Sequence, residues 1–224
     1  MSCKVQVGGR KMNRDLFNYD EQSHKGTYKG FVIPSVTQLL DILYPLSSDI
    51  PTDRLEKASD RGTTIHAQVE NINKLLMAKV EMPKNYQYTN ETLDYMTILN
   101  AYNLIPLRCE ELVFLLDEND EPICYGHYDL VLGAQKNNEP FTDQMAYMFD
   151  IKTTSLFAKE KTALQTHAYR VAFNQNSQYL KLSPQTYGLW LRDGVKIIPL
   201  KQQSDEYIIN LFKQLRGVWN ETKN

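Results

Sequence analysis

The sequence predicts an α/β fold in which a central mixed β-sheet is flanked by α-helices. Apolar residues recur at helical spacing over much of the first hundred residues, and three strand-like runs then follow. A further helical segment separates these runs from two more strand-like runs. That order is the one expected for a single sheet with helices packed on it. The chain has 224 residues, which fits one large domain.

The N-terminal part of this predicted domain, residues 1–105, holds a hairpin and helices. Residues 17–33 alternate loosely around the pairs His24–Gly26 and Lys29–Gly30, as in a short hairpin. Ser35 is a suitable N-cap for a helix that Pro45 ends. Two further helices are expected, over 52–78 and 91–103. The apolar residues that predict the first two helices are Val36, Leu39, Leu40 and Leu43, then Ile65, Val69, Ile72, Leu75 and Leu76.

The predicted core, residues 106–200, contains the strands. Two strand-like runs, 107–118 and 122–133, flank a short polar turn and predict a β-hairpin. A third run, 146–154, is rich in aromatic and β-branched residues. Helical periodicity returns over about 159–180. The remaining expected elements are strands over 185–193 and 195–200 around the turn Asp193–Gly194, and a C-terminal amphipathic helix within 204–221, about 206–219.

Composition excludes some classes of protein and leaves others open. The formal net charge of −2 does not by itself indicate nucleic-acid binding, because proteins that hold DNA mainly through bulk charge are usually basic. An enzyme with acidic metal ligands can be near neutral if its positive charge is placed locally. The three cysteines form no CxxC pair, which argues against a zinc ribbon, an iron–sulfur cluster or a disulfide scaffold. We find neither a signal-peptide pattern nor a membrane-spanning run, so we expect a cytoplasmic protein.

Two aspartates and a lysine carry the chemistry that the sequence suggests. Asp129 and Asp150 lie inside otherwise apolar strands, where an unpaired carboxylate is costly. Asp150 and Lys152 are two residues apart, so on a strand they share one face. A hard divalent cation such as Mg²⁺, which binds one or two carboxylates, phosphate and water, would relieve the repulsion. The Ile151 carbonyl could add a ligand, and Lys152 could hold or polarise an attacking water.

A simpler interpretation stays open at this point. Asp129 could lie at a strand end, and Asp150 and Lys152 could be solvated on an edge strand. Three further features bear on the choice. His66 and Glu70 are one helical turn apart, and so are Gln165 and Tyr169, so each pair can face one site. Of the neighbours Glu110 and Glu111, only one can face that site, and both could instead be charges at its rim.

Together these motifs resemble the RecB-like branch of the PD-(D/E)XK nucleases. The residues on which the resemblance rests are Gly126 and Asp129 on one strand, DIK on the next, QxxxY on the following helix and the upstream segment RGTTIH. This branch includes nuclease domains of helicase–nuclease complexes, CRISPR-associated exonucleases, mitochondrial genome-maintenance exonucleases and phage exonucleases. The segment IPSVTQLLDILYP is also similar to the N-terminal helix entry of the phage and mitochondrial members. The resemblance covers about residues 31–192, and it implies a restriction-endonuclease-like core.

The resemblance implies roles for individual residues. His66, Asp129, Asp150 and the Ile151 carbonyl would bind the metal, with Lys152 as the catalytic lysine. Mg²⁺ is the expected metal, and Mn²⁺ is expected to substitute. The resemblance favours Glu111 over Glu110 as an additional catalytic acid. The resemblance implies that Gln165 and Tyr169 contact or position DNA. By their charge, Arg61 and, on the helix of Gln165, Lys159, Lys161, His167 and Arg170 are also expected to guide a strand, although the latter could simply form a solvated helix face. Tyr128 stands where the superfamily name has proline, and no cysteine quartet is present, so no iron–sulfur cluster is expected.

The leading hypothesis is therefore a Mg²⁺-dependent DNA exonuclease that acts on single strands or free ends. Recombination, repair or phage DNA processing is the implied context, with a recombinase or a single-strand-binding protein as an expected partner. One alternative is a non-catalytic member of the fold that binds DNA or protein. Another is an endonuclease of the same fold, although no extra recognition domain is evident.

Overall fold

A computed structural model describes residues 13–20, 23, 25–45, 51–83, 85–135 and 145–222. Its main sheet has five strands: β4 (Leu104–Leu116), β5 (Pro122–Ala134), β6 (Ala146–Lys152), β7 (Thr186–Leu191) and β8 (Val195–Pro199). They lie side by side in chain order. Only β6 and β7 pair in parallel, and the other neighbours are antiparallel. The predicted α/β fold with a mixed sheet is therefore confirmed.

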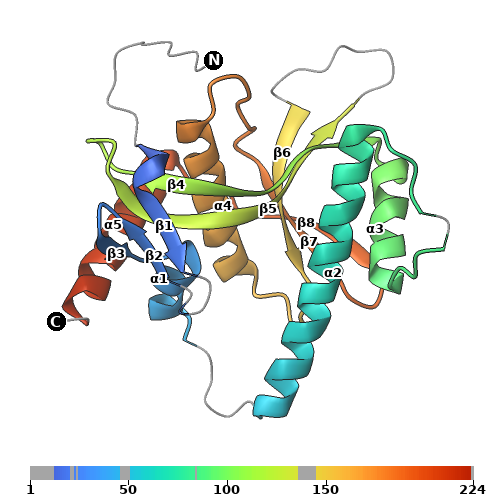
Figure 1. The fold of residues 1–224 in the computed structure, drawn as a ribbon, viewed down its shortest axis with the longest axis horizontal. Coiled ribbons are helices and arrows are strands. Elements are labelled where there is room, and N and C mark those ends of the chain that lie inside the picture. Colours follow the sequence, from blue (N-terminus) through green and yellow to red (C-terminus); the bar gives the residue numbers. More distant parts are fainter. Residues whose placement is uncertain are drawn as a thin grey trace.

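Helices cover both faces of this sheet (Figure 1). The helix α4 (Lys159–Asn176) connects the parallel strands β6 and β7 and packs on one face. The helices α2 (Thr52–Ala78) and α3 (Asn90–Ala101) pack on the other. One buried cluster joins α4 to α1 (Val36–Leu43) and α5 (Asp205–Glu221), and a second joins α2 and α3 to the opposite face of the strands. The sheet is thus the middle layer of three, and its buried side chains are divided between two cores.

A small second sheet packs on the tip of the β4–β5 hairpin. After the 3₁₀ turn Arg14–Leu16, it comprises β1 (Phe17–Asp20), β2 (Lys25–Tyr28) and β3 (Phe31–Ile33), all antiparallel. The predicted hairpin therefore carries a third strand, which follows the turn at Lys29–Gly30. His24, at the first predicted turn, lies outside the described residues. Aromatic residues from both sheets fill the contact, among them Tyr28, Phe114 and Tyr125.

The local signals for helix boundaries are confirmed where a polar side chain caps the helix. Ser35 accepts a hydrogen bond from the backbone of Gln38, and the Gln38 side chain accepts one from Ser35, which together form a capping box. The α2 boundaries agree with the predicted range 52–78. In contrast, α4 ends at Asn176, four residues before the predicted end, where Ser177 takes up an extended conformation. Among the described residues, no helix is both long and apolar enough to cross a membrane.

Candidate active site

The candidate site lies where β5 and β6 separate. Their ladder runs from Gly133–Ala146 to Leu130–Phe149 and stops there. The next residues along the two strands are Asp129 and Asp150. Asp129 Oδ2 accepts a hydrogen bond from the backbone N–H of Ile151 at 2.6 Å, so a side chain takes the place of the next ladder bond. The strands stay joined at this level, and one Asp129 oxygen remains for another partner.

A second group of polar atoms meets Asp129 from the side of α2. His66 Nδ1 lies 3.8 Å from Glu110 Oε1 and 3.8 Å from Asp129 Oδ1. One ligand atom from each of these three residues lies within 4.8 Å of the others, which is close enough for the three to share one cation. His66, Glu110 and Asp129 are partly buried. The cluster therefore unites three segments, α2, β4 and β5, as the sequence predicted for His66 and Asp129.

The structure corrects the choice between the two glutamates. Glu110, not Glu111, faces His66 and Asp129. Glu111 instead accepts a hydrogen bond from the Tyr128 hydroxyl at 2.8 Å and lies 3.7 Å from Arg108. The physical cause is the backbone of Glu110, whose φ of 50° interrupts the regular alternation of β4. Neither strand pattern nor composition signals such a residue in the sequence.

A third set of residues continues the site toward α4. Lys152 Nζ lies 2.6 Å from Asp150 Oδ2 and donates a hydrogen bond to Gln165 Oε1 at 3.2 Å. Gln165 in turn donates to the Tyr169 hydroxyl at 3.4 Å. The Asp150 side chain is only 1% exposed, and its Oδ1 has no hydrogen-bond partner among the described residues. The predicted faces of β6 and α4 therefore meet, and they leave one buried carboxylate oxygen without a partner.

Tyr169 is placed differently from the prediction. Its side chain is buried, with 4% exposure, so it is not available to contact a nucleic acid. Its hydroxyl instead accepts the hydrogen bond from Gln165 and helps to hold that side chain in place. Its ring packs against the backbone of Gly126, where a Cβ would lie 2.5 Å from the Tyr169 ring. The glycine at the start of the predicted motif is thus explained by packing, since only a residue without a side chain leaves room for this ring.

Burial and mutual repulsion control the charges in the site. Burial raises the pKa of Asp129, although His66 and Lys152 oppose this. Burial, together with the charge of Asp129, raises the pKa of Asp150 to about 6 against the opposing effect of Lys152. Burial alone would lower the pKa of His66, but the nearby carboxylates of Glu110 and Asp129 raise it to about 9. Without a bound cation, the positive charges that face these carboxylates are therefore those of His66 and Lys152.

The remaining predicted residues divide into those near the site and those away from it. Glu70 forms an ion pair with Lys74 and helps to line an open hollow of about 450 Å³, shared with His66 and Glu110. Arg61 donates to the Thr153 carbonyl at 3.1 Å and pairs with Glu91, so it ties the end of β6 to α2 and α3. Its guanidinium is therefore already engaged within the protein.

The predicted DNA contacts of Arg170 and His167 are wrong. Arg170 is 3% exposed and forms an ion pair with Asp205 at the start of α5. His167 is fully buried, and its Nε2 lies 3.0 Å from the Lys201 carbonyl oxygen. Helix α5 covers this face of α4, which explains why the face is not solvated. Lys161 pairs with Asp41 at 2.7 Å, and Lys159 lines a separate hollow beside Tyr207.

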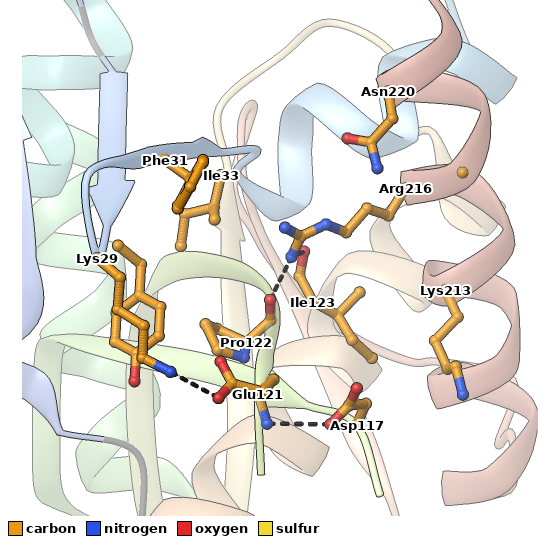
Figure 2. A pocket seen from close by; sticks show the side chains of 12 residues that line it. Lys29, Phe31, Ile33, Asp117, Glu121, Pro122, Ile123, Lys213, Arg216 and Asn220 are labelled. Carbon is orange, nitrogen blue, oxygen red and sulfur yellow. Dashed lines mark hydrogen bonds and ion pairs between the residues drawn. The ribbon is translucent and has the colours of Figure 1, made fainter. Parts of the chain in front are cut away.

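Another hollow, of about 480 Å³, lies away from this cluster, between the β4–β5 turn, the small sheet and α5 (Figure 2). Its cationic side chains bind to the protein itself. Lys29 pairs with Glu121 at 2.6 Å, and Arg216 donates to the Pro122 and Ile123 carbonyls (Figure 2). Lys213 pairs with Glu118 at 2.7 Å. These contacts leave no described cation of this hollow free for an anionic ligand.

Comparisons with known proteins add little to this picture. No protein-family model and no curated protein matches the chain. Among solved structures, one weak match is to the crystal structure of SSO0001, at 12% sequence identity and a TM-score of 0.36. That similarity covers 83% of this chain and 84% of the other. At this distance it supports no statement about function, which must be argued from the site.

Proposed function

We propose that the protein is a Mg²⁺-dependent deoxyribonuclease with a restriction-endonuclease-like core, of the RecB-like PD-(D/E)XK type. One observation carries the proposal: among the residues that the structure describes, the buried Asp150 has an oxygen without a hydrogen-bond partner, beside Lys152 and the cluster of His66, Glu110 and Asp129. Three carboxylates near one another, two of them with a raised pKa, favour a bound cation. The resemblance of the sequence motifs to those of PD-(D/E)XK nucleases favours phosphodiester hydrolysis as the reaction of such a site.

The donor set fits a small divalent cation. His66, Glu110, Asp129 and Asp150 would hold it, and the Ile151 carbonyl follows Asp150 directly in the chain. Mg²⁺ prefers oxygen ligands, whereas imidazole is a ligand that softer ions accept more readily. We therefore expect Mn²⁺ to substitute for Mg²⁺. When bound, the cation would place positive charge beside the phosphate and the attacking water.

Lys152 has the position of a group that acts on the reacting atoms. Asp150 and Gln165 hold its ammonium group from two sides, which fixes its direction. Burial would lower the pKa of Lys152, but Asp150 and Asp129 outweigh this and raise it, so the side chain stays charged. A charged, oriented ammonium stabilises the negative charge that develops on a phosphate during attack, and this role needs no reorganisation of the site.

We favour an exonuclease that acts on DNA ends or single strands, because the sequence motifs resemble those of exonucleases. The test uses purified protein with end-labelled linear DNA and covalently closed circular DNA, with Mg²⁺, with Mn²⁺ and with EDTA. Metal-dependent loss of the linear substrate alone supports the exonuclease. Cutting of circles indicates an endonuclease, and binding without cutting under both metals would refute a nuclease of either kind.

Substitution of Lys152 tests the assignment of the site. Lys152→Ala is expected to lower cleavage by a factor of roughly 10² or more, since the transition state loses its ammonium. It leaves Asp150 without its ion pair, so we expect a loss of about 1–2 kcal/mol of stability at neutral pH, limited by protonation of Asp150. Single-turnover cleavage and urea unfolding measure the two effects. Near-normal cleavage by the folded variant would refute the assignment.

A further inference from the structure

A row of three side chains crosses the sheet beside the candidate site. Lys152 on β6 is the register partner of Trp190 on β7, and Trp190 is the partner of Lys196 on β8. Residues opposite one another on neighbouring strands project from the same face of a sheet. Lys152 points to the face that carries Gln165 of α4. Trp190 and Lys196 therefore extend that face of the site away from Asp150, over roughly 10 Å across two strand spacings.

The indole in the middle of this row is held in place. Trp190 Nε1 donates to the Thr154 carbonyl at 2.8 Å, which fixes the ring to the loop after β6. The Phe157 ring of the same loop lies 6.0 Å from it and packs on Gly188, where a Cβ would lie 2.3 Å from the Phe157 ring. Lys196 Nζ lies 4.9 Å from the indole centroid. A half-buried indole is thus held in a fixed direction, with the Lys196 ammonium beside it and Lys152 at the neighbouring register position.

The charge around the row is mostly positive. Among the described residues, Lys196 forms no ion pair with a carboxylate. Arg192, two residues after Trp190, lies 3.5 Å from the Thr153 carbonyl oxygen, and its neighbour Asp193 is 4.0 Å away and 94% exposed. Leu156, in the loop that holds the indole, is 82% exposed. Exposed apolar surface and a lysine without a carboxylate partner among the described residues, Lys196, therefore occur together at this edge.

We propose that the row Lys152–Trp190–Lys196 binds a single-stranded nucleic acid as it leaves the candidate active site. This inference rests on the proposed function for the identity of its occupant. A base stacks on or beside the Trp190 ring, and Lys196 contacts the phosphate that follows. Alternating cations and an aromatic ring suit a strand whose bases are free, because a paired base cannot turn its face to a side chain. The row contains no group arranged to read a particular base.

The experiment measures binding without cleavage. Trp190 and Trp219 are the two tryptophans of the chain, so Trp219→Phe leaves Trp190 as the fluorescent reporter. This protein is titrated in EDTA with a dT oligomer of about 16 nucleotides and with a duplex of equal length. We expect the single strand to quench Trp190 and the duplex to quench it much less. Anisotropy of labelled oligomer then gives affinity.

Two variants of the row and one control complete the test. Trp190→Ala, which removes the ring, is expected to weaken single-strand binding roughly five- to 150-fold, the range for loss of one base stack on alanine substitution. Lys196→Gln, a change at an exposed position, is expected to reduce the slope of log affinity against log salt by about 0.7 and to leave folding intact. Lys25→Gln, on β2 of the small sheet, changes one exposed lysine elsewhere and serves as the matched control. It is expected to bind as the unmodified protein does.

The outcomes separate this inference from the nuclease proposal. Equal quenching by duplex and single strand, or unchanged binding by both row variants, overturns the row even if the protein cuts DNA. Specific quenching in a protein that cuts under no metal supports the row and refutes the nuclease. A salt slope that falls equally in Lys196→Gln and Lys25→Gln also overturns it, because the contribution would then be general charge.

Discussion

Glu110 has a left-handed backbone in the middle of a strand, with a φ of 50°. For a residue with a side chain, such a conformation costs of order 1 kcal/mol or more, and it persists where the surrounding structure imposes it. Here it directs a carboxylate toward His66 and Asp129. Cys109, the preceding residue, packs in the α2–α3 core, so two successive residues of β4 face the same helix layer. We infer that the strain serves the proposed metal site.

At the same scale, the pair Glu110 and Glu111 offers a matched comparison. Glu110→Gln is expected to weaken Mn²⁺ and Mg²⁺ binding by roughly tenfold or more, because it removes a proposed ligand charge. Glu111→Gln, which changes only the contacts to Tyr128 and Arg108, is expected to leave metal affinity within about twofold of the original. Titration calorimetry of the two variants measures this. Equal losses in both would place the metal elsewhere.

Residues of the site were predictable from the sequence to different degrees. Asp129, Asp150 and Lys152 stand out because charged side chains interrupt apolar strands, and His66 and Gln165 follow from helical spacing. Glu110 could not be found in this way, since regular alternation gives no reason for its φ. Arg170 resembled a surface residue because its partner Asp205 is 35 positions later in the chain. Contacts between distant segments decide such cases, and local patterns do not contain them.

At the scale of elements, the approach of α4 to β5 depends on one missing side chain. The Tyr169 ring lies against Gly126, and through Gln165 this contact fixes the height of α4 above Lys152.

The strands and helices themselves were well predicted from the sequence, because apolar periodicity reflects which face of an element is buried. The third strand of the small sheet and the early end of α4 were not, since β-pairing and the extended conformation of Ser177 depend on contacts with other parts of the chain.

Gly126→Ala tests this packing. Its Cβ would lie 2.5 Å from the ring, so Tyr169 must move, and we expect a loss of about 1–3 kcal/mol of stability. Gly217→Ala in α5 is the control, because no atom lies within 4 Å of its added Cβ. In a helix, that change is expected to be neutral or to stabilise by up to about 1 kcal/mol. Chemical denaturation compares the two, and equal stabilities would show that the ring is not confined.

At the scale of the whole molecule, α4, α5 and the sheet meet around a buried polar group. His167 lies among Arg170, Asp205, Thr186 and the Lys201 carbonyl. Burial and the charge of Arg170 lower the pKa of His167 from 6.5 to about 4. The folded state therefore binds this proton more weakly than the unfolded state does. Above pH 6.5 both states are neutral at His167 and no stability is lost, whereas between pH 6.5 and 4 the unfolded state gains protons first.

His167 is thus expected to remove up to about 3 kcal/mol of stability as the pH falls through this range. His167→Gln cannot take up the proton, so its stability should depend less on pH over the same interval. Other groups titrate there too, among them Asp150, and the difference between the two unfolding profiles isolates the histidine. Parallel profiles for variant and unmodified protein from pH 7 to 4 would contradict the buried, neutral assignment.

The Asp129 carboxylate makes two kinds of contact. Its Oδ2 accepts the hydrogen bond from the Ile151 N–H and so joins β5 to β6, and its Oδ1 faces His66. Exchange of the Ile151 amide with solvent deuterium therefore reports on the site without substrate or metal. Asp129→Ala should expose this amide to rapid exchange while Leu130 stays protected by its own ladder. Asp129→Asn, which keeps an acceptor oxygen, should retain much of the protection. The same amide would then register whatever occupies the other oxygen of Asp129.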